Sequence, residues 1–235
     1  MEIGLSKEHF KEELLKRDPK RAELLFNGFE HYLKRLIEVN TVMNLTAITE
    51  ASEIREKHFL DCMMIEAFIP ENSTVADVGS GAGFPGLVLA LLRPDCQIDL
   101  IEPTTKRCTF LTQMKDELQL KNVTILNRRA EECDDKKEAY DVVTARAVAP
   151  LSILMELCIP LLKTGGNFIA MKGSSALDEL KNANHAMSEF SLNSPRLESF
   201  DLPHAGQRIN LIFTKTQKSP SRYPRAYRLI KKNPL

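Results

Sequence analysis

Paired cysteines, long apolar runs and an excess of charge of one sign are all absent from this chain of 235 residues. The five cysteines are odd in number and none belongs to a Cys-x-x-Cys pair, which argues against a disulfide framework and a zinc ribbon. No stretch approaches the roughly 18 apolar residues of a membrane span, since the run Leu87–Leu92 stops at Arg93 and Pro94. The charged residues 2–21 lack the apolar core of a secretory signal. We therefore expect a cytoplasmic protein without a membrane segment.

The net charge of zero conceals an uneven distribution of charge. The 32 basic and 32 acidic side chains, taken as a sum, favour neither a nucleic-acid-binding protein nor an enzyme of acidic substrates. From Leu202 onward, however, there are eight basic residues and no acidic one, whereas the preceding 201 residues carry 24 basic and 32 acidic side chains. Tyr223 and Tyr227 alternate with arginines here, which favours RNA stacking and phosphate contact over a merely solubilising tail. The eight basic residues are Arg208, Lys215, Lys218, Arg222, Arg225, Arg228, Lys231 and Lys232.

Hydrophobic spacing divides the chain into three segments. Apolar side chains recur at helical spacing over residues 20–40, and a second helix is expected from a cap near Ser52 to Pro70. Residues 40–48 between them are rich in Asn and Thr and are expected to form a loop. The predicted segments are a helical extension at 1–70, a main domain at 71–216 and a basic tail at 217–235.

Short β-rich runs alternate with helical segments from Ser73 onward. This alternation predicts βαβ crossovers and a largely parallel sheet with helices on both faces. The last two runs are joined by Pro203–Gly206, a turn typical of hairpins, so the sheet is expected to end with an antiparallel pair. The predicted fold class is therefore α/β, with a Rossmann-like sheet of seven strands. The predicted strands are 74–78, 97–101, 122–126, 141–145, 167–171, 196–202 and 207–214.

A glycine-rich loop, Asp77-Val-Gly-Ser-Gly-Ala-Gly-Phe-Pro-Gly86, follows the first predicted strand. Glycines let the chain turn tightly and let a ligand approach the backbone, and the following helix presents unpaired amide groups, so a nucleotide-like ligand is expected. Glu102 lies 21 residues after Gly81, where a carboxylate would accept hydrogen bonds from ribose hydroxyls. The predicted cofactor-binding residues of this region are Asp77, Gly79, Ser80, Gly81, Gly83, Phe84 and Glu102.

The spacing of this loop fits both a dinucleotide and S-adenosylmethionine. S-adenosylmethionine is favoured because Asp77 places an anion beside the turn, which suits an ammonium or sulfonium group better than a pyrophosphate. The chain also lacks a second domain for a hydride-transfer substrate, and a terminal hairpin is typical of methyltransferases. Two alternatives stay open at this point. One is a non-enzymatic nucleotide-binding module that recognises RNA or a partner protein, and the other is an NAD-dependent dehydrogenase.

Basic residues end the fourth and fifth predicted strands. Arg146 and Lys172 are the candidate catalytic residues, because ligands of open α/β sheets bind at the carboxyl ends of the strands. Each can bind an anionic group of a ligand, or can instead form a structural ion pair. Cys158 lies in an apolar helical segment and is not expected to be a nucleophile. His58 and Asp61 share a helix face, but without further ligands no metal site is predicted.

Several short motifs follow one another along nearly the whole chain. The glycine loop with its Phe-Pro-Gly ending and the motif Thr144-Ala-Arg-Ala147 are the most specific. The others are Asn44–Ile48, His58–Asp61, Lys106-Arg107, Arg129–Glu131, Leu162–Gly166, Lys172-Gly173 and Tyr223–Arg225. In these motifs the chain resembles the bacterial ribosomal RNA small subunit methyltransferase G family, also called glucose-inhibited division protein B. It departs from that family at Val39, where tryptophan is common, at Cys62, where serine is common, and at Tyr227, where glycine is usual.

The resemblance implies a class I methyltransferase that methylates N7 of a guanosine in the 530 loop of 16S rRNA and releases S-adenosylhomocysteine. It places Gly79, Phe84, Ala130, Glu131 and Arg146 at the S-adenosylmethionine. The expected partner is 16S rRNA or the 30S subunit, and the expected state is a monomer. Because N7 carries a lone pair and no proton, its methylation needs no general base, and positioning is the main catalytic contribution. The predicted RNA-binding residues are Lys106, Arg129, Arg208, Arg222, Arg225 and Arg228.

Overall fold

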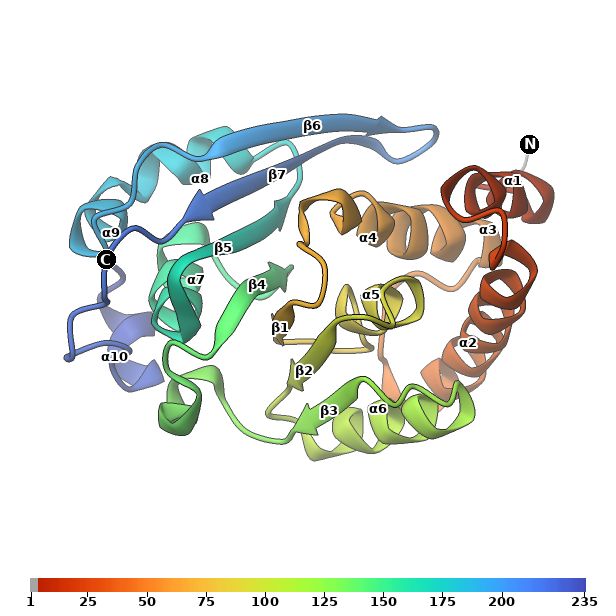
Figure 1. The fold of residues 1–235 in the computed structure, drawn as a ribbon, viewed down its shortest axis with the longest axis horizontal. Coiled ribbons are helices and arrows are strands. Elements are labelled where there is room, and N and C mark those ends of the chain that lie inside the picture. Colours follow the sequence, from red (N-terminus) through yellow and green to blue (C-terminus); the bar gives the residue numbers. More distant parts are fainter. Residues whose placement is uncertain (1–3) are drawn as a thin grey trace.

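A single sheet of seven strands forms the centre of the computed structural model, which describes residues 4–235. The first three residues of the predicted extension 1–70 lie outside the described residues. The strand order is β3-β2-β1-β4-β5-β7-β6; the pairs from β3 to β5 are parallel, and β7 pairs antiparallel with both β5 and β6. The predicted parallel sheet with its antiparallel end is confirmed (Figure 1). The strands are β1 Thr74–Val78, β2 Gln97–Ile101, β3 Val123–Leu126, β4 Tyr140–Arg146, β5 Leu162–Lys172, β6 Arg196–Leu202 and β7 Gly206–Thr214.

Helices cover both faces of the sheet, because successive strand residues point to opposite sides. In β1, Val75 belongs to one apolar core, while Ala76 and Val78 belong to the core on the other face. Figure 1 shows α2, α5 and α6 on one side, and α7, α9 and α10 on the other. The helices are α1 Lys7–Arg17, α2 Ala22–Met43, α3 Ala51–Ile54, α4 Asp61–Met63, α5 Gly86–Leu92, α6 Thr105–Glu117, α7 Leu151–Cys158, α8 Ala176–Asn182, α9 Asn184–Glu189 and α10 Tyr227–Lys232.

The N-terminal helices pack tightly on the sheet. The predicted loop at 40–48 is shorter in the structure, because α2 continues to Met43 and ends at the left-handed residue Asn44. The helix predicted from Ser52 to Pro70 is regular only in part: α3 continues through a π-helical turn at Arg55–Leu60 into α4. Sequence periodicity does not reveal such a turn, which widens the helix by one residue.

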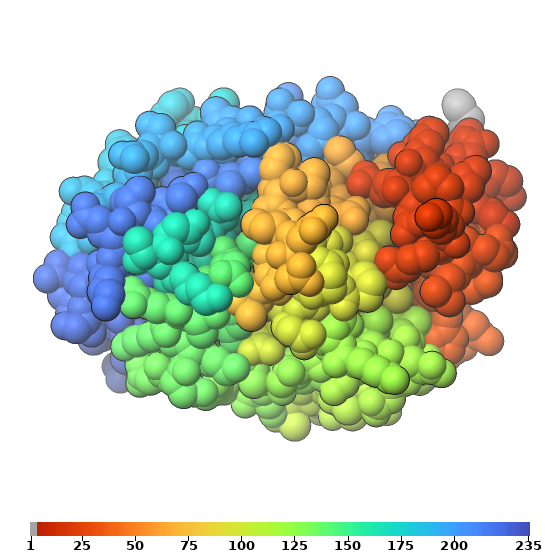
Figure 2. Space-filling model, in the orientation of Figure 1, coloured from red at the N-terminus to blue at the C-terminus, as the bar shows by residue number. Residues whose placement is uncertain are grey.

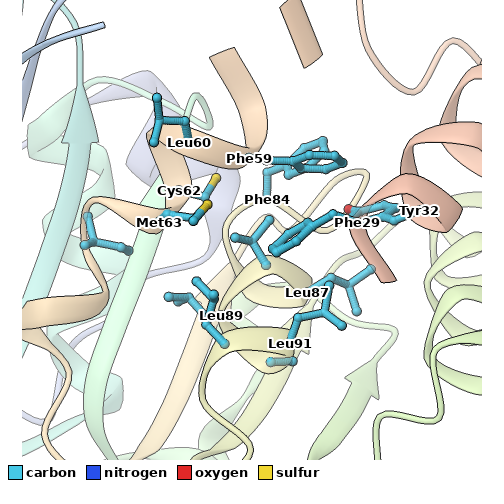
Figure 3. Packing of buried hydrophobic residues seen from close by; sticks show 14 of the residues in the cluster. Phe29, Tyr32, Phe59, Leu60, Cys62, Met63, Phe84, Leu87, Leu89 and Leu91 are labelled. Carbon is cyan, nitrogen blue, oxygen red and sulfur yellow. The ribbon is translucent and has the colours of Figure 1, made fainter. Parts of the chain in front are cut away.

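An aromatic cluster joins these helices to the glycine loop. Phe59 of the π-helical turn lies between Phe29 and Tyr32 of α2, with ring centroids 5.0 and 5.3 Å away. Tyr32 in turn stacks on Phe84 of the glycine loop at 5.6 Å. Figure 3 shows these rings together with the apolar side chains of α5. The helical extension therefore supports the loop directly.

The C-terminal segment is also packed rather than extended. Tyr223 and Ile230 are buried in the core that contains α7, and α10 contacts that helix. Figure 2 shows this segment, in blue, lying against the green and teal parts of the chain. Lys215, one of the eight basic residues that follow Leu202, is fully buried and donates to the Leu162 carbonyl at 2.7 Å. None of the helices within residues 4–235 has the length and apolar character to cross a bilayer.

Candidate functional site

The glycine loop turns sharply at the carboxyl end of β1. Gly79 has a φ of +74°, and a Cβ atom there would lie 2.5 Å from Cγ2 of Val148, so the position requires glycine. Asp77 is fully buried beneath the loop and accepts hydrogen bonds from the Gly86 amide at 2.9 Å and the Thr144 hydroxyl at 3.3 Å. Burial raises the pKa of Asp77 to about 6. Asp77 therefore braces the loop from below, and it is not among the residues that line the two cavities described next.

A cavity of about 240 Å³, here called the loop cavity, opens beside the glycine loop. It lies at the carboxyl ends of β1 and β2, between the turn after β3 and the loop after β4. Four predicted cofactor-binding residues meet there: Gly79, Glu102, Ala130 and Glu131. The remaining lining residues are Val78, Ile101, Pro103, Thr104, Arg107, Arg129, Ala147, Val148, Leu157 and Tyr227.

The other residues predicted from the glycine loop lie outside this lining. Ser80 donates from its hydroxyl to the Asp77 carbonyl at 2.9 Å, and Gly81 donates its amide to Glu102 at 3.0 Å. Gly83 is closely covered by Tyr32 and Leu87, and Phe84 is buried in the aromatic cluster. These residues shape the loop from behind and leave its ligand-facing surface to Gly79.

Two carboxylates of the loop cavity differ in how they are held. Glu102 is buried, and its oxygens accept from the amides of Gly81 at 3.0 Å and Thr104 at 2.8 Å. Glu131 is half-buried, its carboxylate accepts only from its own backbone amide and has no ion pair among the described residues, and burial raises its pKa. The cavity thus contains the carboxylate of Glu102, which two amides hold, and that of Glu131, which no other described residue holds.

A second cavity, of about 460 Å³, lies at the ends of β4 and β5 and is here called the strand-end cavity. It brings together Arg146, Lys172 and Arg208. Arg146, predicted as both a catalytic and a cofactor-binding residue, lines this cavity and not the loop cavity. Ala147 and Val148 line both cavities, which are therefore adjacent. The other residues of the strand-end cavity are Asp61, Ala149, Met171, Gly173 and Glu179.

Each cation of the strand-end cavity has a carboxylate partner. Asp61 of α4 lies between two arginines, with Oδ2 at 3.1 Å from Nε of Arg146 and Oδ1 at 3.5 Å from Nε of Arg208. Lys172 donates from Nζ to Glu179 at 2.7 Å and to the Ala149 carbonyl at 2.9 Å. These pairs hold the cations in place, since a paired side chain loses rotamer freedom before a ligand arrives.

Arg146 is also positioned by His58. The Nη2 group of Arg146 donates to the Lys57 carbonyl at 2.6 Å and to Nδ1 of His58 at 3.1 Å. Burial, and then the charge of Arg146, lower the pKa of His58 to about 3, so the imidazole is neutral. Because Nδ1 accepts, Nε2 carries the proton and donates to the Thr46 hydroxyl at 2.8 Å.

This network gives a role to two motifs that sequence analysis left without one. The segment Asn44–Ile48 supplies Thr46, and His58–Asp61 supplies both groups that hold Arg146. The spacing of His58 and Asp61 on one helix face was visible in the sequence. An imidazole and a carboxylate at this spacing suit a guanidinium as well as a metal ion.

The predicted RNA-binding residues are dispersed over the surface. Lys106 and Arg228 are exposed and have no hydrogen bond or ion pair among residues 4–235. Arg222 pairs with Glu189, and Arg225 pairs with the buried Glu156, so these two arginines hold the C-terminal segment. Arg208 lies in the strand-end cavity and Arg129 in the loop cavity. A count of charges along the sequence does not distinguish free from paired side chains.

Nucleophile and metal chemistry find no support in the described part of the chain. Cys158 is fully buried, and burial raises the pKa of its thiol, so a thiolate does not form there. Residues 4–235 contain no group of three or more His, Cys, Asp or Glu side chains placed to hold a metal ion.

Comparison with known proteins identifies the family. A family model described as rRNA small subunit methyltransferase G matches residues 26–213. The chain belongs to the rRNA small subunit methyltransferase G family. The family member of Staphylococcus carnosus is 41% identical over 214 residues, covering 88% of this chain and 89% of the relative. That of Lysinibacillus sphaericus is 39% identical over 237 residues, covering 98% and 100%.

Solved structures agree on the fold of this rRNA small subunit methyltransferase G family member. A SAM-dependent O-methyltransferase from Thermotoga maritima superimposes with a TM-score of 0.55 at 18% identity, covering 79% of this chain and 73% of that one. A ribosomal protein L11 methylase from Lactobacillus delbrueckii gives 0.55 at 19% identity, covering 68% and 79%. The Rossmann-like class I methyltransferase fold predicted from the sequence is confirmed.

Proposed function

We propose that this protein transfers the methyl group of S-adenosylmethionine to N7 of a guanosine in the 530 loop of 16S rRNA. The observation that carries the proposal is the pair of adjacent cavities in a member of this family. The loop cavity follows the glycine loop, the strand-end cavity gathers three cations, and Ala147 and Val148 lie in the walls of both. A donor in one and an acceptor in the other meet at this shared wall.

The loop cavity suits S-adenosylmethionine, which supplies an electrophilic methyl group when bound. The carboxylate of Glu102 is fixed by two amides and keeps lone pairs for ribose hydroxyls. Glu131 has lone pairs left to accept from the amino group of adenine. Ile101, Ala130 and Leu157 provide apolar surface for the flat base. We assign cofactor binding to these residues and to Gly79.

The strand-end cavity suits a guanine that presents N7 and O6. Methylation of N7 removes no proton, so the site needs orientation and not a base. The Nη1 group of Arg146 has only the Cys62 sulfur, at 3.6 Å, as an acceptor among the described residues, which leaves it free to donate to O6. Arg146 is therefore assigned to base orientation. Lys172 and Arg208 supply positive charge for O6 or a flanking phosphate.

The substrate in this proposal is 16S rRNA, naked or within the 30S subunit, in the cytoplasm. The enzyme acts as a monomer, with residues 71–216 as the catalytic unit and the extension 1–70 supplying the groups that hold Arg146. The exposed Lys106 and Arg228 contact rRNA phosphates.

Transfer of labelled methyl to RNA tests the proposal. The 16S rRNA and 30S subunits of a strain lacking the enzyme are incubated with the protein and labelled S-adenosylmethionine, and the modified base is mapped. We expect label at a guanine N7 in the 530 loop. Arg146→Ala should lower the rate at least about 100-fold while S-adenosylmethionine still binds, because Arg146 lies outside the loop cavity. Lys181→Ala, at an exposed ion pair on α8, is the matched control.

Other outcomes of this experiment contradict the proposal. Label on tRNA or protein alone would remove the rRNA substrate. Cofactor binding without transfer to any RNA would favour the non-enzymatic binding module. A full rate in Arg146→Ala would remove Arg146 from the orientation of the base.

A further inference from the structure

We propose that the C-terminal segment completes the cofactor site, with the ring of Tyr227 as a wall on which adenine stacks. This inference rests on the proposed function. Tyr227 lines the loop cavity, whereas the other lining residues all lie between positions 78 and 157. The charge of the segment around Tyr227 favours RNA contact, whereas the structure places this side chain in the lining of the loop cavity.

The position of Tyr227 within the loop cavity matches the adenine end. Its ring lies 4.9 Å from the guanidinium of Arg129, which directly precedes Ala130 and Glu131. Glu131, which is paired with no other side chain among the described residues, offers an acceptor for an amino group, and Glu102 offers one for the ribose. An adenine bound between these two carboxylates would share the loop cavity with the Tyr227 ring.

Stacking is favoured by the arrangement of Arg129 and Tyr227. A guanidinium near the tyrosine ring restricts its orientation through a cation–π contact. Tyr227 is half-buried against the core, so one part of its surface is supported and the rest borders the cavity. Tyrosine gives a large apolar contact area at low entropic cost, which suits a flat aromatic ligand.

Anchors on both sides of Tyr227 keep the ring in place. On the N-terminal side, Tyr223 is buried against Phe190 with ring centroids 5.0 Å apart. Arg225 donates from Nε and Nη2 to the two oxygens of Glu156 at 2.7 and 2.6 Å. On the C-terminal side, Ile230 is fully buried. The ring is therefore preorganised and does not need to be ordered by the ligand.

The same helix carries an anchor and a wall of the cavity. Glu156 of α7 binds Arg225, and its neighbour Leu157 lines the loop cavity. Because these two residues are neighbours on α7, the helix fixes the C-terminal segment close to the loop cavity. A truncation after Thr216 removes Tyr227 together with its anchors, and we expect it to weaken cofactor binding.

Calorimetric titration of purified full-length protein with S-adenosylmethionine, S-adenosylhomocysteine and adenosine tests the inference. Tyr227→Ala should weaken all three by a similar factor, roughly 5- to 100-fold, because the contact is to the base. Tyr227→Phe should bind within about twofold of the wild type, since the ring and not the hydroxyl carries the contact. Lys231→Ala, at an exposed residue of the same helix, is the matched control and should bind as the wild type does.

A fluorescent variant gives a second readout that does not depend on activity. The chain contains no tryptophan, so Tyr227→Trp introduces a single reporter at the proposed contact. Titration with adenosine should change its emission and saturate at the affinity measured by calorimetry, because a base stacked on the indole alters its surroundings.

The outcomes separate the inference from the proposed function. If wild type binds all three ligands, and Tyr227→Ala binds them equally tightly with the Tyr227→Trp emission unaltered, the inference is overturned and the proposed function stands. If wild type binds none of them, the proposed function fails and this inference fails with it.

Discussion

Replacement of Arg225 by methionine is expected to destabilise the protein strongly, although the sequence places this arginine in the basic tail at 217–235. Its guanidinium and its backbone amide donate three hydrogen bonds to Glu156, whose side chain is fully buried on α7. Arg225→Met removes two of them and leaves a buried carboxylate without its counter-charge. Breaking a buried ion pair from one side costs about 3–5 kcal/mol. The retained amide bond and the 26% exposure of the Arg225 side chain favour the lower end, about 3 kcal/mol.

Urea unfolding at neutral pH measures this loss directly. The matched control is Arg222→Met, which breaks an exposed pair with Glu189 and should cost less than about 1 kcal/mol. The double variant Arg225→Met with Glu156→Leu should recover most of the loss, because no charge then remains buried. A loss below about 1 kcal/mol in Arg225→Met, or no recovery in the double variant, would refute the role of this pair as an anchor.

The remaining predictions concern the glycine loop and the residues behind it. Asp77 has its folded pKa raised from 3.8 to about 6, so its stabilising contribution is present below pH 3.8 and is lost as pH rises through 6. In urea unfolding, the free energy of unfolding of the wild type should fall by about 3 kcal/mol relative to that of Asp77→Asn as the pH rises from 3.8 to above 6. Free energies of the two proteins that change in parallel with pH would contradict this prediction. His58 behaves oppositely: its folded pKa is lowered from 6.5 to about 3, so stability present above pH 6.5 is lost as pH falls toward 3, and thermal unfolding of His58→Gln should depend less on pH over this range. Gly79→Ala should lower the free energy of unfolding by about 2–4 kcal/mol, because of its positive φ and the close contact of the new Cβ with Val148. In the double variant Gly79→Ala with Val148→Ala, the part of the loss due to the contact should disappear and the part due to φ should stay. Equal losses in the single and double variants would contradict this prediction.

The sheet and the glycine loop could be predicted because their signals are local. A β-rich run or a cluster of glycines depends on neighbouring residues, and the strands predicted at 74–78, 97–101 and 196–202 have the bounds seen in the structure. The family motifs likewise lie in continuous stretches of sequence. These signals sufficed for the fold and for the position of the loop cavity.

The contacts that hold Arg146 and Arg225 come from residues far away in the sequence. Arg146 is held by groups 84 to 89 positions earlier, and Arg225 is bound by a carboxylate 69 positions earlier. Charge alone predicted solvent or RNA for Arg225, whereas packing brings a buried Glu156 to it. The position of Asp77 in the sequence likewise does not reveal that its carboxylate lies beneath the loop and accepts from Gly86 and Thr144. Only the tertiary arrangement separates such residues from those that face a ligand.

The shared wall formed by Ala147 and Val148 also bears on inhibitor design. Under the proposed function, donor and acceptor occupy adjoining cavities and meet beside this short segment. A bisubstrate compound would join an adenosine moiety in the loop cavity to a purine in the strand-end cavity. Its linker would pass beside the small Ala147 side chain, where the methyl group itself is transferred, so a bulkier residue at that position should weaken the inhibitor and slow methyl transfer together.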